Sequence, residues 1–149
     1  HRRLLPGRRA RLPLSRRIEA GSGIKAGEGI KAGWGIEAGE GIKAGSGIKA
    51  GSGIEAGEGI KAGSGIKAGG GIKAGSGIEA GGGIEAGLAI ACKRELSVRL
   101  RVFAGTCIWK LASEAERTVT CSQFVGGEVA YGCLVETEPA SSPTEGKVT

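Results

Sequence analysis

Isoleucine recurs every six residues without a slip from Ile18 to Ile84, and alanine follows each isoleucine two places later. Lys or Glu stands between them, and a Gly-x-Gly step separates most copies. A unit this short cannot bury its apolar side chains alone, so it must stack on copies of itself. The hexad therefore predicts an all-β, single-stranded parallel β-helix whose core is a ladder of isoleucines. The ladder comprises Ile24, Ile30, Ile36, Ile42, Ile48, Ile54, Ile60, Ile66, Ile72, Ile78 and Ile84.

The period above six can be read from the charged residue of each hexad. Three successive triplets, which begin at Glu19, Glu37 and Glu55, read Glu-Lys-Lys, and the fourth, from Lys73, reads Lys-Glu-Glu. An eighteen-residue coil with one hexad on each of three sides accounts for this pattern, whereas a twelve-residue, two-sided coil would scramble the signs. Duplication of an eighteen-residue gene segment would give the same pattern without structural meaning.

The hexad also predicts which residues face inward and how the chain turns. Alternate residues of a strand face the same way, so Ile and Ala point together and Lys or Glu points oppositely. We expect the Gly-x-Gly step to turn each corner because glycine tolerates positive φ. The six-residue spacing continues through Ile90, Leu96, Val102 and Ile108, which gives sixteen hexads between residues 18 and 111. Sixteen hexads make about five coils of a rod roughly 25 Å tall, whose ends need covering.

Other repeat architectures fit the pattern poorly. A helix needs apolar residues at spacings of three and four and few glycines, and collagen needs Gly at every third place. Calcium-binding β-rolls need Asp in their turns, and the chain contains no Asp. Disorder is the remaining alternative for a Gly-rich, charged tract, although a strict register of isoleucines argues against it.

Residues 18–111 resemble the hexapeptide-repeat β-helix class, in which an aliphatic residue recurs every six places beside a small one. They are also similar to bactofilin-type polymer-forming proteins and to bacterial or phage-derived proteins with Gly-Ile-Glu-Ala-Gly arrays. The resemblance implies a rod that assembles or presents a surface. One slot departs from the class: two places before the isoleucine, where a small inward residue is usual, stand Glu28, Trp34, Glu40 and Glu58. Because buried glutamates are costly, we expect this slot at an exposed corner and leave the handedness open.

The residues needed for catalysis are scarce in this chain. Acyltransferases of the hexapeptide class use a catalytic His and its carbonic anhydrases three, whereas this sequence has one, His1, outside the repeat. Without Asp no Ser/His/Asp set can form, and recurring Gly-x-Gly steps make a chance phosphate-loop match uninformative. We therefore expect no enzyme, no cofactor and no metal site. We interpret the surface rows of Lys and Glu as solvent-exposed faces.

Cys92, Cys107, Cys121 and Cys133 match no zinc or redox spacing. Two disulfides with three pairings would be allowed, but we favour four buried free thiols that pack as small apolar groups. The sequence leaves the cellular location unknown, with the cytoplasm favoured. No stretch is long and apolar enough for a membrane span.

Positive charge is concentrated in residues 1–17, which hold seven arginines and no acid, whereas the remainder holds fourteen basic and fifteen acidic residues. We interpret this segment as a basic, disordered arm with three alternative roles: none, a targeting sequence, or contact with anions or nucleic acid. The candidate contact residues are Arg2, Arg3, Arg8, Arg9, Arg11, Arg16 and Arg17.

The C-terminal part, residues 112–137, reads as strands that cap the rod. We expect one strand over 117–121 and another over 128–135, with a turn at Gly126-Gly127 and a short helical or turn insert at 113–116. The aromatic residues gathered here, Phe103, Trp109, Phe124 and Tyr131, would seal the apolar end. Residues 138–149 are rich in Ser, Pro and Thr and read as a disordered tail.

The leading hypothesis for function is a non-enzymatic structural rod that self-associates into an oligomer or polymer. A second hypothesis is a phage or cell-surface adhesin that binds a surface glycan through its Lys and Glu faces. A third is nucleic-acid binding through the arginine-rich arm.

Overall fold

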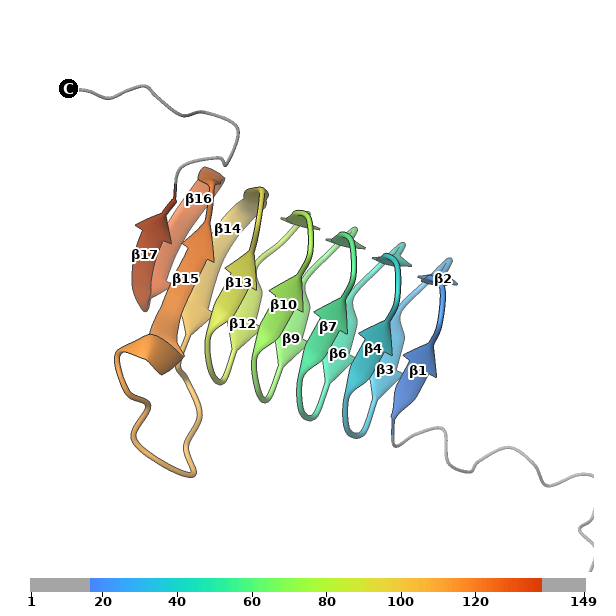
Figure 1. The fold of residues 1–149 in the computed structure, drawn as a ribbon, viewed down its shortest axis with the longest axis horizontal. Helices are drawn as coiled ribbons and strands as arrows, with labels where there is room; N and C mark the ends of the chain where they lie inside the picture. Colours follow the sequence, from blue (N-terminus) through green and yellow to red (C-terminus); the bar gives the residue numbers. More distant parts are fainter. Residues whose placement is uncertain (1–16, 138–149) are drawn as a thin grey trace, which may run out of the picture.

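The computed structural model describes residues 17–137 and shows a parallel β-solenoid with three faces (Figure 1). Each regular hexad forms one Ile-x-Ala strand, and the chain then turns a corner onto the next face. Every such strand pairs in parallel with the strand eighteen residues further on, so that Ile18 pairs with Ile36 and Ile24 with Ile42. The predicted all-β fold with three sides and eighteen-residue coils is confirmed, and a twelve-residue coil is excluded.

The first face holds seven parallel strands in a single sheet, stacked in chain order. They are β1 (Ile18–Ala20), β4 (Ile36–Ala38), β7 (Ile54–Ala56), β10 (Ile72–Ala74), β13 (Ile90–Cys92), β15 (Thr118–Cys121) and β17 (Cys133–Glu136).

The second and third faces are built from the remaining hexads. The second face has β2 (Ile24–Ala26), β5 (Ile42–Ala44), β8 (Ile60–Ala62) and β11 (Ile78–Ala80). The third has β3 (Ile30–Ala32), β6 (Ile48–Ala50), β9 (Ile66–Ala68) and β12 (Ile84–Ala86). Two longer strands, β14 (Glu95–Ala104) and β16 (Gln123–Tyr131), continue both faces and join them in one sheet. A 3₁₀ helix, η3 (Ala115–Arg117), precedes β15.

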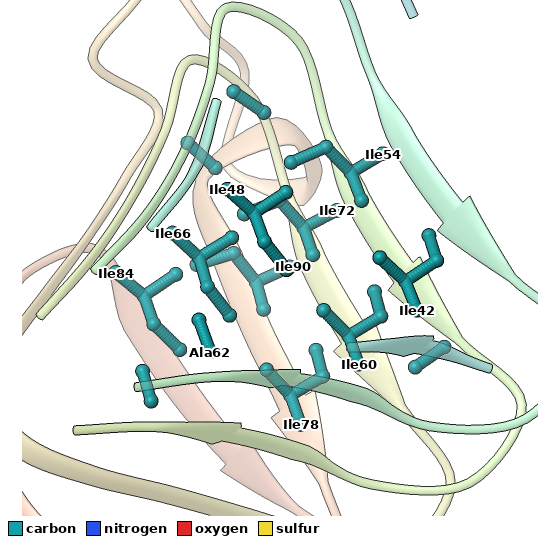
Figure 2. Packing of buried hydrophobic residues seen from close by; sticks show 14 of the residues in the cluster. Ile42, Ile48, Ile54, Ile60, Ala62, Ile66, Ile72, Ile78, Ile84 and Ile90 are labelled. Carbon is teal, nitrogen blue, oxygen red and sulfur yellow. The ribbon is translucent and has the colours of Figure 1, made fainter. Parts of the chain in front are cut away.

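The isoleucine and alanine side chains of all three faces converge on one narrow core. Figure 2 shows Ile54, Ile72 and Ile90 of the first face opposite Ile42, Ile60 and Ile78 of the second. From Ile36 onward these isoleucines are about 1% exposed or less, whereas Ile18 and Ile24 of the first coil are only partly buried. Burial of each contributes roughly 1.5–3 kcal/mol, which offsets the entropy lost in ordering the glycines.

The corner glycines are required for a reason other than the expected one. Positive φ occurs only at Gly105, Gly126 and Gly132 within the described residues, all outside the regular array, so the prediction of positive φ at the corners was wrong. The glycine after each alanine instead lies against the preceding coil. Gly57, for example, donates its N–H to Ala38 O at 3.0 Å, and a Cβ added to it would overlap the carbonyl oxygen of Gly39. Close approach between coils therefore excludes a side chain there.

The second glycine of the Gly-x-Gly step has more room in the middle of the array, whereas at Gly77 and Gly83 a Cβ would lie 2.8 Å from a backbone oxygen. A Cβ on Gly59 would lie 3.4 Å from Gly77 O, an ordinary contact. In the fifth coil the equivalent positions are filled by Ala89, Glu95 and Arg101. The middle residue of the step lies at an exposed corner, as expected for Glu28, Glu40 and Glu58.

The C-terminal strands extend the same stack. β15 pairs in parallel with β13, β17 with β15, and β16 with β14. The first expected strand, 117–121, matches β15, whereas Gly132 divides the second between β16 and β17. The expected turn at Gly126-Gly127 lies inside β16, where the register with β14 shifts.

Two parts of the C-terminal prediction were wrong. Ile108 and Leu111, expected in the core ladder, are 96% and 95% exposed, because residues 108–117 leave the stack before β15. The aromatic residues do not gather over the end of the rod. Trp109 and Tyr131 are exposed, whereas Phe124, which pairs with Leu96, packs partly buried against the core.

Candidate interaction surfaces

Each face carries one outer column of side chains, formed by the residue between Ile and Ala. In the first three coils the column of the first face is acidic, with Glu19 next to Glu37 and Glu37 next to Glu55. The columns of the second and third faces are basic over the same coils. They comprise Lys25, Lys43 and Lys61 on the second face and Lys31, Lys49 and Lys67 on the third.

The fourth coil reverses the sign of all three columns. Its strands place Lys73 beside Glu55, Glu79 beside Lys61 and Glu85 beside Lys67. Lys61 Nζ and Glu79 Oε1 lie 4.0 Å apart, the one ion pair between column residues in the part of the chain that the structure describes. Exposed pairs of this kind contribute at most about 1 kcal/mol.

The arginine-rich arm is represented by a single described residue. Arg17 is exposed, and its Nη1 lies 4.0 Å from Glu19 Oε1. It lines a groove of about 650 Å³ with Trp34, Glu37, Glu55 and Lys73 on the first face. The other candidate arginines, Arg2, Arg3, Arg8, Arg9, Arg11 and Arg16, lie outside the described residues.

A second groove, of about 840 Å³, lies where the third face meets the C-terminal coils. Leu100 and Phe103 form its apolar wall, and Lys67 and Glu85 line it from the neighbouring coils. The sequence does not reveal this groove, because Glu128, which lines it and pairs with Arg101, follows Arg101 by 27 residues rather than 18.

The two ends of the solenoid differ in how their backbone edges are satisfied. Gly39, Gly45 and Gly51 donate their N–H groups to the alanine carbonyls of the first coil. That coil has no preceding coil among the described residues, so the equivalent N–H groups of Gly21 and Gly27 lack this kind of acceptor. No strand among the described residues 17–137 therefore pairs with the outer side of the edge strands β1, β2 and β3.

At the C-terminal end, a side chain occupies the edge. Glu136 pairs with Cys121 in the register of the first face, and its Oε2 accepts a hydrogen bond of 2.8 Å from Phe124 N–H. Thr137 N–H donates to Cys121 O at 2.8 Å. A carboxylate at the edge blocks the addition of another strand because burying it unpaired would be costly.

All four cysteines are free thiols, two buried and two partly buried. Cys92 and Cys121 follow the register pair Ala91 and Thr120, so they occupy neighbouring coils on the first face. Burial, together with the neighbouring Cys121, raises the pKa of Cys92 to about 12. Burial and Glu136 also raise the pKa of Cys121. These protonated thiols are poor nucleophiles at neutral pH.

The described residues hold neither a cluster of metal-ligating side chains nor a membrane-spanning helix. Over residues 17–137 no three His, Cys, Asp or Glu side chains gather closely enough to hold a metal ion. The same range contains no helix long and apolar enough to span a membrane. Comparisons with family models, curated proteins and solved structures find no match to this chain.

Proposed function

We propose that this protein is a non-enzymatic structural rod that self-associates through its N-terminal end. The observation that carries the proposal is the outer edge of β1, β2 and β3, which no strand within residues 17–137 covers and where Ile18 and Ile24 are only partly buried. An unpaired strand edge is a template for pairing with another chain. If the N-terminal end of a second copy docked here, its edge strands would pair with these strands and cover the isoleucines.

The contrast between the ends supports pairing of two N-terminal ends. The C-terminal edge carries Glu136, bonded to Phe124 N–H, whereas the inward side chains of the first coil are Ile and Ala. Contact between two such N-terminal ends buries apolar groups and leaves no carboxylate inside. The contact involves the first coil alone, within residues 18–35.

The test is to place a carboxylate at each end in turn and to measure mass by light scattering at several concentrations. Ile24→Glu puts an inward charge in the first coil, and we expect it to abolish self-association in salt high enough to screen surface charge. Leu134→Glu is the matched control: Leu134 is 41% exposed at the C-terminal end, and we expect it to leave the mass of the assembly unchanged. Circular dichroism of both variants checks that the solenoid is intact.

Two results would contradict the proposal. One is a wild-type protein that stays monomeric at every concentration in salt high enough to screen surface charge. The other is loss of association in Leu134→Glu but not in Ile24→Glu.

A further inference from the structure

The outer columns of the first and second faces are opposite in charge at four successive coils. Glu19, Glu37 and Glu55 are followed on the first face by Lys73, whereas the second face has three lysines followed by Glu79. We propose that two copies bind side by side, with parallel axes and coils in register, the first face of one against the second face of the other. This inference deepens the proposed self-association by adding a lateral surface.

Each column repels itself within one chain. Neighbouring strands lie about 4.8 Å apart, so Glu37 has a like charge on each side along the first face. Among residues 17–137, Lys25 and Lys43 make no ion pair within 4.0 Å, and Glu37 and Glu55 make none either. A facing column of opposite sign would supply the missing counter-charges, which is the electrostatic complementarity of a specific interface.

The sign reversal in the fourth coil selects one alignment. In register and parallel, all four levels pair opposite charges, including Lys73 with Glu79 of the neighbour. A slip by one coil keeps two attractive pairs and creates one repulsive pair, which in one direction of slip is Glu55 against Glu79. The best antiparallel alignment pairs three levels and leaves the C-terminal coils of both rods without a partner. Like charges brought together penalise the wrong registers.

Charge alone does not distinguish the second face from the third, but the C-terminal coils do. There the second face continues with Ser97 and Val125, which are small enough for flush contact with Ala91 of the first face. The third face continues with Phe103 and Tyr131. The loop 108–117 leaves the stack between the third and first faces (Figure 1). Contact between a third and a first face would bring the loops of both copies together at the shared corner.

The four charged levels span only about 20 Å of the rod. Such a narrow contact falls at the small end of protein interfaces, so we expect weak binding that depends on salt. The expected association constant falls at least about tenfold between 0.01 M and 1 M salt. End-to-end association through apolar edges does not weaken in this way, which separates the two contacts experimentally.

The experiment is sedimentation velocity of the full chain at low and high salt, with charge-swapped variants. The first-face variant carries Glu19→Lys, Glu37→Lys and Glu55→Lys. The second-face variant carries Lys25→Glu, Lys43→Glu and Lys61→Glu. The matched control, on the third face, carries Lys31→Glu, Lys49→Glu and Lys67→Glu. Circular dichroism confirms that each variant retains its β structure.

We expect each of the first-face and second-face variants alone to lose the salt-sensitive association. Their mixture should regain it, because the altered columns are again opposite in charge at all four levels. The third-face control should associate like the wild type. The inference is overturned if the mixture does not associate, if the third-face control loses association, or if association at low salt is absent in the wild type. Loss of the salt-resistant association alone would contradict only the proposed end contact.

Discussion

The regular array, from β1 to β13, and the C-terminal coils, from β14 to β17, share one parallel stack but turn their corners differently. The array turns at Gly-x-Gly steps and shows charged columns, whereas β14 and β16 run through the corner as continuous strands with Phe103 and Tyr131 on the outside. Both regions keep apolar residues in the inward slots, such as Ile78 beside Leu96. The stack therefore requires inward apolar side chains, and glycine is required only where coils meet at a tight corner.

The largest effect should separate the core ladder from the loop that leaves it. Ile60 is 1% exposed and Ile108 is 96% exposed, although both keep the six-residue spacing. Ile60→Lys places a charge among stacked isoleucines and should reduce the free energy of unfolding by about 5 kcal/mol. Ile108→Lys should change it by less than about 0.5 kcal/mol. Urea unfolding followed by circular dichroism measures both, and equal shifts would contradict the assignment of the loop.

The second prediction separates the two glycines of one corner. Gly57→Ala drives a Cβ into the carbonyl of Gly39 and should cost about 3 kcal/mol, because the backbone of two coils must move. Gly59→Ala meets Gly77 O at 3.4 Å without positive φ, and should stabilise by up to about 1 kcal/mol through the unfolded chain. Thermal unfolding of the pair checks the opposite signs. The same sign for both would show that the corners are held by local conformation after all.

The architecture was predictable because it depends on a period, and the corners were not because they depend on contact between coils. The Glu-Lys-Lys triplets that begin at Glu19, Glu37 and Glu55 predict the eighteen-residue coil, which the register confirms. Residue 57 must be glycine because a Cβ there would overlap the carbonyl oxygen of Gly39, eighteen residues earlier. The Gly-x-Gly motif by itself therefore does not reveal this requirement. A local preference for positive φ was the wrong physical cause.

The candidate surfaces were predictable only where the period holds. The charged columns follow directly from the hexad. The groove beside Phe103 and the edge position of Glu136 follow from register after a loop of irregular length. Spacing alone assigned Ile108 to the ladder because the sequence does not mark where the chain leaves the stack.

The third prediction concerns a thiol in the slot that alanine occupies in the array. Cys92 lies beside Ala74 in the register, and burial raises its pKa to about 12. A raised pKa in the folded state gives stability that is present below the unfolded pKa near 9.0 and is lost as pH rises towards the folded value. By about pH 10.5 the free energy of unfolding of the wild type should have fallen by roughly 2 kcal/mol more than that of Cys92→Ala. Parallel pH profiles for the two proteins would contradict the buried, protonated thiol.

The smallest effect tests the sign reversal between coils. Lys73 pairs with Glu55 in the register, and Lys73→Glu extends the acidic column by one residue. The expected loss is about 0.2–1 kcal/mol, and it should shrink at high salt. Adding Glu55→Lys should recover part of the lost pair energy. A loss of the same size at every salt concentration would show that Lys73 acts through packing rather than charge.

The eighteen-residue coil is tested most directly by oxidative cross-linking between outer positions, with the linked peptides identified by mass spectrometry. Lys43 and Lys61 pair in the register, so cysteines placed there lie about 4.8 Å apart at the backbone, within the range that a disulfide spans. Lys49, twelve residues before Lys61, lies on another face. The account predicts a cross-link in Lys43→Cys/Lys61→Cys and none in Lys49→Cys/Lys61→Cys. A cross-link in the second variant but not in the first would contradict the three-sided solenoid.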